Sequence, residues 1–143
     1  MKTQQAHPDG QSVVRRWSRH PRNVGRARAE LRDALTGWGM AEVADSAVLV
    51  LSELLTNAID HARVSPGRQI ETRYRREDAG VRIEVHDAAE QRPRRAGQGN
   101  DVERGRGLFI VDALADGWGV SDRDGVGKAV WAVVTVSGSG RWL

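Results

Sequence analysis

Three polar side chains at a helical spacing interrupt the apolar stretch LVLSELLTNAIDHA, residues 49–62. Glu53 and Asn57 are four residues apart and Asp60 follows three residues later, so on a helix all three share one face. An asparagine oxygen can ligate Mg²⁺, which usually keeps waters and nucleotide phosphates among its ligands. A carboxylate one turn earlier can accept a proton from an attacking hydroxyl or water. The stripe therefore indicates either magnesium-dependent phosphate chemistry or a face that lies in water.

A second candidate is the segment ERGRGLFIVDALAD, residues 103–116, in which Gly105 and Gly107 precede an apolar pattern. The first N–H groups of a helix lack intrahelical partners and attract phosphate, and glycines let the backbone approach such an anion closely. Arg104 and Arg106 add positive charge. The segment is typical of a phosphate-binding turn, although a glycine loop that caps a helix has the same pattern.

The third candidate is Asp87, the last residue of VRIEVHD. A carboxylate at the point where a half-buried strand opens into a loop can accept a hydrogen bond from an amino group, such as that of adenine. The alternative is an aspartate that begins a turn by bonding to its own backbone.

The first half of the chain is predicted to form a strand and two helices, the second of which carries Glu53 and Asn57. Residues 12–18 contain β-branched residues and a tryptophan and predict a first strand. Apolar residues recur at helical spacing in residues 21–39, and Gly37 and Gly39 supply a stop signal. Residues 41–62 give the strongest helical pattern, and residues 63–69 are rich in turn formers.

In the second half, residues 70–77 and 81–87 alternate apolar and polar side chains and predict an antiparallel hairpin with one face in water. Residues 88–107 show no periodicity, and a loop of that length in a small domain is often functional. A short helix is expected over residues 108–116 and a second hairpin over residues 118–123 and 128–136.

This order of elements predicts an α+β fold of two layers, with a mixed, mostly antiparallel sheet covered on one face by helices. The length of 143 residues fits one domain, here residues 12–143, after a flexible N-terminal segment, residues 1–11.

Composition narrows the class of protein. No stretch reaches the roughly 20 apolar residues of a membrane span, the N-terminus has no apolar signal region, and cysteine is absent. These features favour a cytoplasmic protein without disulfides or a membrane partner. The formal net charge of +3 permits an anionic partner without requiring one. An Arg-rich loop that contacts nucleic acid is an alternative, but the sequence shows no helix-turn-helix or aromatic stacking platform to support it.

The motifs ELLTNAIDHA, Asp87 on a strand end, GRGL at a helix start and GKAVW on a late strand occur in the order and spacing of a known family. Over roughly residues 12–136 the chain resembles the GHKL ATPases, whose ATP site is called the Bergerat fold. Within that family it looks most like the small bacterial anti-sigma-factor serine/threonine kinases. Each motif alone is weak, and their combination is fairly specific.

The resemblance implies a role for each candidate residue. Asn57 would coordinate Mg²⁺, Glu53 would be the general base, and Asp87 would bind the adenine amino group. The ATP lid would comprise residues 91–104. Phosphate contacts would come from the glycine-rich segment, namely Arg104, Gly105, Arg106, Gly107 and Leu108.

The chain departs from the family pattern at three positions. Ala89 and Gln91 stand where the family often has the glycines of D-x-G-x-G, which give the nucleotide room. Ala129 stands where a threonine usually follows GK near the adenine. One lost hydroxyl contact would weaken binding by about 1 kcal/mol.

The function implied by the resemblance is an ATP- and Mg²⁺-dependent kinase. It would transfer the γ-phosphate to a Ser or Thr of an antagonist protein and would bind a sigma factor, with a homodimer as a further expectation. The alternative is a non-catalytic, nucleotide-responsive protein-interaction module of the same fold. The retained Glu53 and Asn57 favour the kinase, and the changes at Ala89, Gln91 and Ala129 favour the module.

Overall fold

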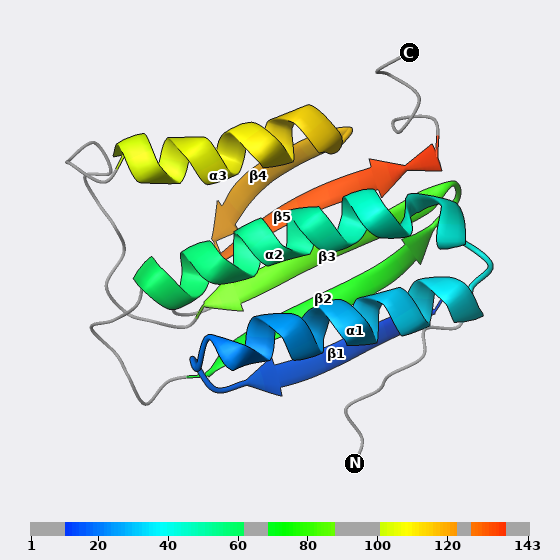
Figure 1. The fold of residues 1–143 in the computed structure, drawn as a ribbon, viewed down its shortest axis with the longest axis horizontal. Helices are drawn as coiled ribbons and strands as arrows, with labels where there is room; N and C mark the ends of the chain where they lie inside the picture. The colour runs from blue at the N-terminus through cyan, green and yellow to red at the C-terminus, as the bar shows by residue number, and fades with distance from the viewer. Residues whose placement is uncertain (1–10, 62–68, 88–100, 123–126, 137–143) are drawn as a thin grey trace.

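The computed structural model describes residues 11–61, 69–87, 101–122 and 127–136, with only the backbone described for His61 and residues 101–107 (Figure 1). Its described strands form one five-stranded sheet in the order β1-β2-β3-β5-β4, and every neighbouring pair is antiparallel. The strands are β1 Ser12–Trp17, β2 Ile70–Glu77, β3 Gly80–Asp87, β4 Gly117–Asp122 and β5 Lys128–Thr135.

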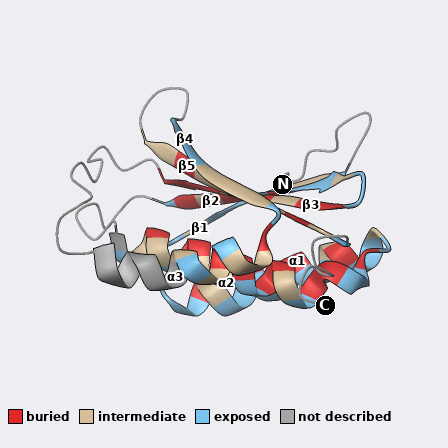
Figure 2. Ribbon diagram, turned by 90° about the horizontal axis from the view of Figure 1, so that it is seen from above, coloured by how far each residue is buried: buried red, intermediate tan, exposed pale blue. Residues whose placement is uncertain are grey.

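All the described α-helices cover one face of this sheet and leave the other face open (Figure 2). They are α1 Arg22–Gly37, α2 Ala44–His61 and α3 Asp101–Leu114, and a short 3₁₀ turn, η1 Ala41–Val43, precedes α2. The core lies between the two layers and consists mainly of aliphatic side chains. The predicted two-layer α+β fold is confirmed, with an antiparallel rather than a mixed sheet among the described strands.

Helix α1 forms where the apolar spacing predicts it. Ala27, Leu31 and Leu35 are fully buried at intervals of four residues, which places them on the face toward the sheet. The helix ends before Gly39, whose φ of 75° is a left-handed conformation that glycine adopts without steric cost. The predicted stop signal therefore acts through Gly39.

The β2–β3 hairpin lies at the centre of the sheet and carries Asp87 on its last residue. Its turn requires Gly80, because a Cβ there would lie 2.0 Å from the carbonyl oxygen of Val134 on β5. The pairing of β1 with β2 is reinforced by Trp17 Nε1, which donates a hydrogen bond of 2.9 Å to Thr72 Oγ1. The strand that presents Asp87 is therefore fixed on both sides.

Helix α3 begins seven residues earlier than predicted. The sequence places its start at Leu108 after two glycines, whereas the structure begins it at Asp101 and ends it at Leu114. A glycine inside a helix costs only about 1 kcal/mol. An acidic residue in the first turn favours the helix dipole, and α3 packs against α2 further along. The two glycines are therefore tolerated within the helix.

The connection from α3 to β4 is locked to β5 by Asp116. Its Oδ2 accepts hydrogen bonds from the backbone N–H and the hydroxyl of Thr135, at 2.7 and 2.8 Å, and its own N–H donates to Val133. These bonds hold β4 at the edge of the sheet beside the helical layer.

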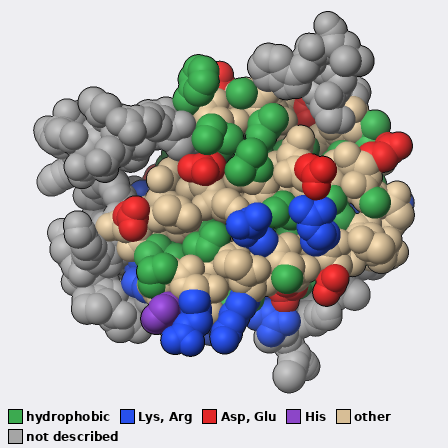
Figure 3. Space-filling view, viewed as in Figure 1, with side chains coloured by type: hydrophobic (Ala, Val, Ile, Leu, Met, Phe, Trp, Pro, Cys, Tyr) green, Lys and Arg blue, Asp and Glu red, His purple; other side chains and the backbone are tan. Residues whose placement is uncertain are grey.

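The outer surface of the helical layer is mixed in character. Figure 3 shows hydrophobic side chains grouped over α3 and basic side chains over α1. Phe109 of α3 is the most exposed large hydrophobic residue of the described part of the chain, at 72%. None of the described helices has the length and apolar character that crossing a membrane would require.

At the predicted N-terminal boundary, Gln11 already pairs with β2 through its backbone and its side chain. The remainder of the predicted flexible segment, residues 1–10, lies outside the described residues, as do Ala89, Gln91 and residues 91–100 of the predicted lid.

Candidate functional site

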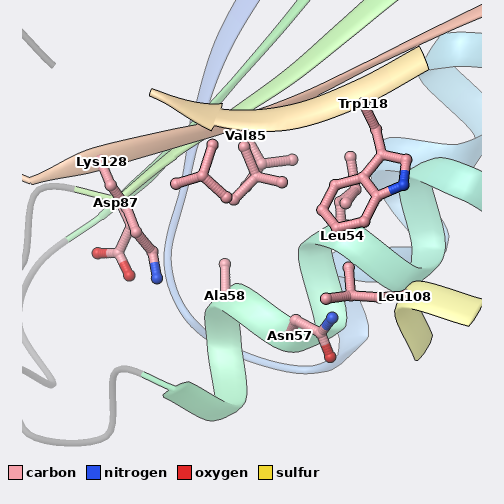
Figure 4. A pocket seen from close by; sticks show the side chains of 10 residues that line it. Leu54, Asn57, Ala58, Val85, Asp87, Leu108, Trp118 and Lys128 are labelled. Atoms are coloured by element: carbon pink, nitrogen blue, oxygen red, sulfur yellow. The ribbon is translucent and has the colours of Figure 1, made fainter. Parts of the chain in front are cut away.

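A cavity of about 90 Å³ lies between the helical layer and the sheet, where α2 and α3 face the ends of β3, β4 and β5 (Figure 4). Most of its wall is apolar, with two oppositely charged groups and one amide. The lining residues are Leu54, Asn57, Ala58, Val85, Asp87, Leu108, Trp118, Val120, Lys128 and Val130.

The strand register explains which side chains reach the cavity. Asp87 pairs with Lys128, and Val85 pairs with Val130, across the β3–β5 ladder. Paired residues point to the same face, and alternate residues along a strand share that face. The charged pair and the valine pair therefore both point toward the helices, and Figure 4 shows Asp87 and Lys128 close together on one side of the cavity.

Helix α2 presents the predicted polar stripe at the rim of the cavity. Asn57 lines the cavity beside Ala58, and one turn earlier Glu53 is half-buried, while Asp60 is exposed. Of the three residues of the stripe, Asn57 therefore borders the cavity and Asp60 lies in solvent. Side chains four residues apart on a helix lie about 5–6 Å apart at their Cβ atoms, which brings Glu53 near Asn57.

Asp87 is buried, with 5% of the residue exposed, and it forms an ion pair that sequence reasoning missed. Its Oδ1 accepts a hydrogen bond of 2.8 Å from Nη2 of Arg19, and each of the two side chains is 7% exposed. The residues lie 68 positions apart. No local pattern distinguishes Arg19 from the other arginines of the sequence, so its ion pair with Asp87 could not be predicted from the sequence.

Trp118 and Lys128 are two further lining residues that the sequence did not assign a role. The Trp118 indole N–H donates a hydrogen bond of 3.1 Å to Asp112 Oδ1 on α3, which fixes the ring against the cavity. Lys128 is the lysine of the GKAVW motif, and the alternation of β5 directs it inward beside Asp87. The GKAVW motif could have identified Lys128 as a site residue, whereas no sequence pattern pointed to Trp118.

The glycine-rich segment lies within α3, so the prediction of a turn that precedes the helix is wrong. Gly105 and Gly107 follow the helix start by four and six residues, together with Arg104 and Arg106. The N–H groups that lack intrahelical partners at a helix start belong to its first four residues, here 101–104. Leu108 reaches the cavity, whereas the side chains of residues 104–107 are outside the description.

Position 129 points away from the cavity. Ala129 pairs with His86 and Ser121, in the row of the sheet that faces the helix-free side. There it lines a polar groove of about 370 Å³ with residues such as Glu84 and Trp131. The missing hydroxyl at Ala129 is therefore not a lost contact of the cavity, which corrects the expectation from the sequence.

On the face of the sheet that no described helix covers, charged side chains of β3 bond to one another. Glu84 accepts a hydrogen bond from His86 Nε2 at 2.8 Å and another from Arg82 Nε at 2.7 Å. The His86 bond lowers the pKa of Glu84 to about 2, against the opposing effect of burial and with a further lowering by Arg82. Arg82 also lies 4.6 Å from the centre of the Trp131 ring. These contacts stiffen the strand that ends in Asp87.

The cavity suits a flat heterocycle with an amino group. Leu54, Val85, Val130 and Trp118 offer apolar walls, and the Asp87 carboxylate offers an acceptor at one end. A volume of about 90 Å³ is well below the 300–1,000 Å³ typical of a whole ligand pocket. The base of a nucleotide is therefore the part that these walls would enclose, and its sugar and phosphates would extend past the rim.

The donor set also limits how a metal could bind. Within the described part of the chain, no three residues among His, Cys, Asp and Glu are grouped to hold a metal ion. Asn57 supplies one amide oxygen at the rim. This fits Mg²⁺, which proteins usually hold through one or two side chains while phosphates and waters complete its shell.

Comparisons with known proteins agree with this geometry. The family described as the histidine kinase-like ATPase domain matches residues 17–134. Among solved structures, the chain is similar to the histidine kinase domain of the blue-light activated histidine kinase of Erythrobacter litoralis EL346, with a TM-score of 0.55 and 20% sequence identity. The match covers 81% of this chain and 62% of that one, and at this identity the likeness is one of fold. A search of curated proteins found no match.

Proposed function

The chain belongs to the histidine kinase-like ATPase family, and from this premise we propose that it is a regulatory kinase that uses ATP and Mg²⁺. It transfers the γ-phosphate to a Ser or Thr of an antagonist protein and binds a sigma factor. The observation that carries the nucleotide part is the buried Asp87 carboxylate at one end of an apolar cavity, with Asn57 at its rim.

Each role follows from where the side chain lies. Asp87 accepts a hydrogen bond from the adenine amino group, and the apolar walls exclude water from the base. Asn57 contributes its amide oxygen to Mg²⁺, and the ion, when bound, neutralises phosphate charge. Glu53, half-buried one turn before Asn57, accepts the proton of the attacking hydroxyl. We expect the phosphates to lie near the first half of α3, where Arg104 and Arg106 of the sequence supply positive charge.

An exposed aromatic residue beside the cavity supports transfer to another protein. The exposed Phe109 on α3 is an aromatic residue of the kind enriched in protein interfaces, and it is one position from Leu108 of the cavity. A partner, or a second copy of the chain, could contact α3 beside the nucleotide.

Calorimetric titration with ATP and Mg²⁺ tests the nucleotide site. We expect micromolar binding by the wild type and at least tenfold weaker binding by Asn57→Ala, since the variant loses a metal ligand. Thr56→Ala is the matched control, because Thr56 is the exposed neighbour on the same helix. Chelation of Mg²⁺ should remove most of the difference between wild type and Asn57→Ala. Absence of wild-type binding at millimolar ATP would contradict the proposal.

A non-catalytic, nucleotide-responsive interaction module is the second candidate, because Glu53 does not line the cavity. Glu53→Gln separates the two functions. A kinase with this variant keeps ATP affinity and loses phosphate transfer to its partner, since only the base is changed. A module shows no transfer with either form of the protein.

A further inference from the structure

Arg19 has a buried side chain that joins two walls of the cavity. It lies in the connection between β1 and α1, and its Nη2 donates to Asp87 Oδ1 at the end of β3. Its Nη1 donates a hydrogen bond of 3.3 Å to the carbonyl oxygen of Ala58 in the last turn of α2. One guanidinium thus fixes the strand end that carries Asp87 relative to the helical turn that carries Asn57.

The connection that carries Arg19 is itself held in place. The amide of Asn23 donates to the carbonyl oxygen of Ser18 at 3.1 Å and to its hydroxyl at 2.9 Å, and Asn23 is buried. The backbone N–H of Arg22 donates to His20 Nδ1 at 3.0 Å. These bonds on both sides of Arg19 fix the backbone from which its side chain enters the protein.

The chemistry of the three groups explains why arginine suits this position. A buried carboxylate requires a charged or hydrogen-bonded partner, and a guanidinium is planar, always protonated and able to donate in two directions. The Ala58 carbonyl is among the last four of α2, which lack intrahelical partners and favour a nearby cation. A lysine ammonium carries the charge but lacks the fork that reaches both acceptors.

The ion pair is compatible with ligand binding at the same carboxylate. Asp87 lines the cavity, whereas Arg19 approaches it from the β1–α1 connection and is not part of the lining. An ionised carboxylate offers about four acceptor sites. A donor from the cavity side can therefore bond to Asp87 while Arg19 holds it from behind.

We propose that Arg19 is the positioning residue for adenine recognition: it orients the Asp87 carboxylate so that the carboxylate selects a purine with a 6-amino group. This inference rests on the proposed nucleotide site. It assigns base selectivity to a residue far from the family motifs in sequence, and it predicts that selectivity and overall nucleotide affinity can be separated.

The test compares two ligands by calorimetry in the presence of Mg²⁺: ATP, and the triphosphate of purine riboside, which is ATP without its 6-amino group. We expect the wild type to prefer ATP by about tenfold or more, as a hydrogen bond to a charged acceptor allows. In Arg19→Lys and Arg19→Gln the two affinities should converge to within about threefold, mainly through loss of ATP affinity. Arg15→Gln is the matched control, since it removes an ion pair with Glu30 of α1 in which Arg15 is 45% exposed.

A second measurement needs no nucleotide. Urea unfolding of wild type, Arg19→Lys, Asp87→Asn and the double variant should show non-additive shifts of the midpoint, because the two residues form one ion pair. Asp87→Asn keeps an acceptor oxygen but loses the charge, so it should reduce the preference for ATP, and adding Arg19→Lys should then change the preference little further.

Three results would overturn the inference. An undiminished ATP preference in both Arg19 variants, or an equal weakening of both ligands, would leave Arg19 with a structural role only. Additive midpoint shifts would show that the pair does not form in solution. If the wild type binds neither triphosphate, the nucleotide site itself fails, a result distinct from a change confined to the Arg19 variants.

Discussion

Replacing Glu84 with glutamine should destabilise the protein at neutral pH and have little effect in acid. The carboxylate of Glu84 bonds to His86 and to Arg82, and the first of these bonds lowers its pKa from the ordinary 4.5 to about 2. A carboxyl group whose pKa is lowered by folding stabilises the fold at pH values above its unfolded pKa. That contribution is lost as the pH falls through the folded pKa, so the window lies between pH 4.5 and about 2.

The magnitude follows from the two pKa values. Each pH unit between them corresponds to about 1.4 kcal/mol, which sets an upper value of about 3 kcal/mol for ionised Glu84. The side chain keeps 20% of its surface exposed, so solvent screens part of this interaction. We therefore expect Glu84→Gln to lower the free energy of unfolding by about 2 kcal/mol at neutral pH.

Urea unfolding followed by tryptophan fluorescence measures this loss at about pH 7, 5 and 3. The difference between wild type and variant should be largest at the two higher values and clearly smaller at the lowest. Glu77→Gln is the control, because Glu77 and its partner Arg75 are 34% and 50% exposed, and such a surface pair contributes less than about 1 kcal/mol. An equal loss for Glu84→Gln at all three pH values would refute the reasoning, since it would indicate altered packing rather than a lost charge.

Two further substitutions probe the cavity and the sheet. Ala58→Leu places a larger side chain into a cavity of about 90 Å³ and should weaken ATP binding at least tenfold by calorimetry. The control Ala29→Leu, on the exposed side of α1, should leave ATP affinity unchanged. Unchanged affinity in Ala58→Leu would exclude this cavity as the base site. Gly80→Ala puts a Cβ 2.0 Å from the Val134 carbonyl oxygen and should lower the free energy of unfolding by about 1–3 kcal/mol in urea titrations. In the control Gly25→Ala the added Cβ meets no atom within 4 Å, so the free energy of unfolding should rise slightly. Similar effects of the two substitutions would contradict the steric argument.

The family signal and the element types were accessible from local patterns. The periodicity of α1 and the alternation of β2 and β3 reflect which side chains a helix or strand can bury. Such patterns can be recognised from consecutive residues alone. The type and order of the motifs around Asn57 and Asp87 likewise identified the family that residues 17–134 match. These features needed no knowledge of distant contacts.

The start of α3 shows where local reasoning failed. Gly105 and Gly107 are poor helix formers, so the sequence predicted a turn there, whereas the helix begins at Asp101. A cost of about 1 kcal/mol per glycine is small beside the packing of a helix on its neighbour. The packing of α3 on α2 is enough to offset the cost of both glycines within the helix, and the roles of residues 104–107 stay predictions.

The sequence by itself determined the fold class, the helical stripe of Glu53 and Asn57, and the strand end at Asp87, because each depends on spacing within one element. Only the tertiary structure decided what surrounds them. The register between β3 and β5 turned Lys128 toward the cavity and Ala129 away from it, since a shift of one residue exchanges the faces of a strand. The fold also brought Arg19 to Asp87 across 68 positions, a pairing that no local pattern encodes because it exists only when β1, α2 and β3 are packed together.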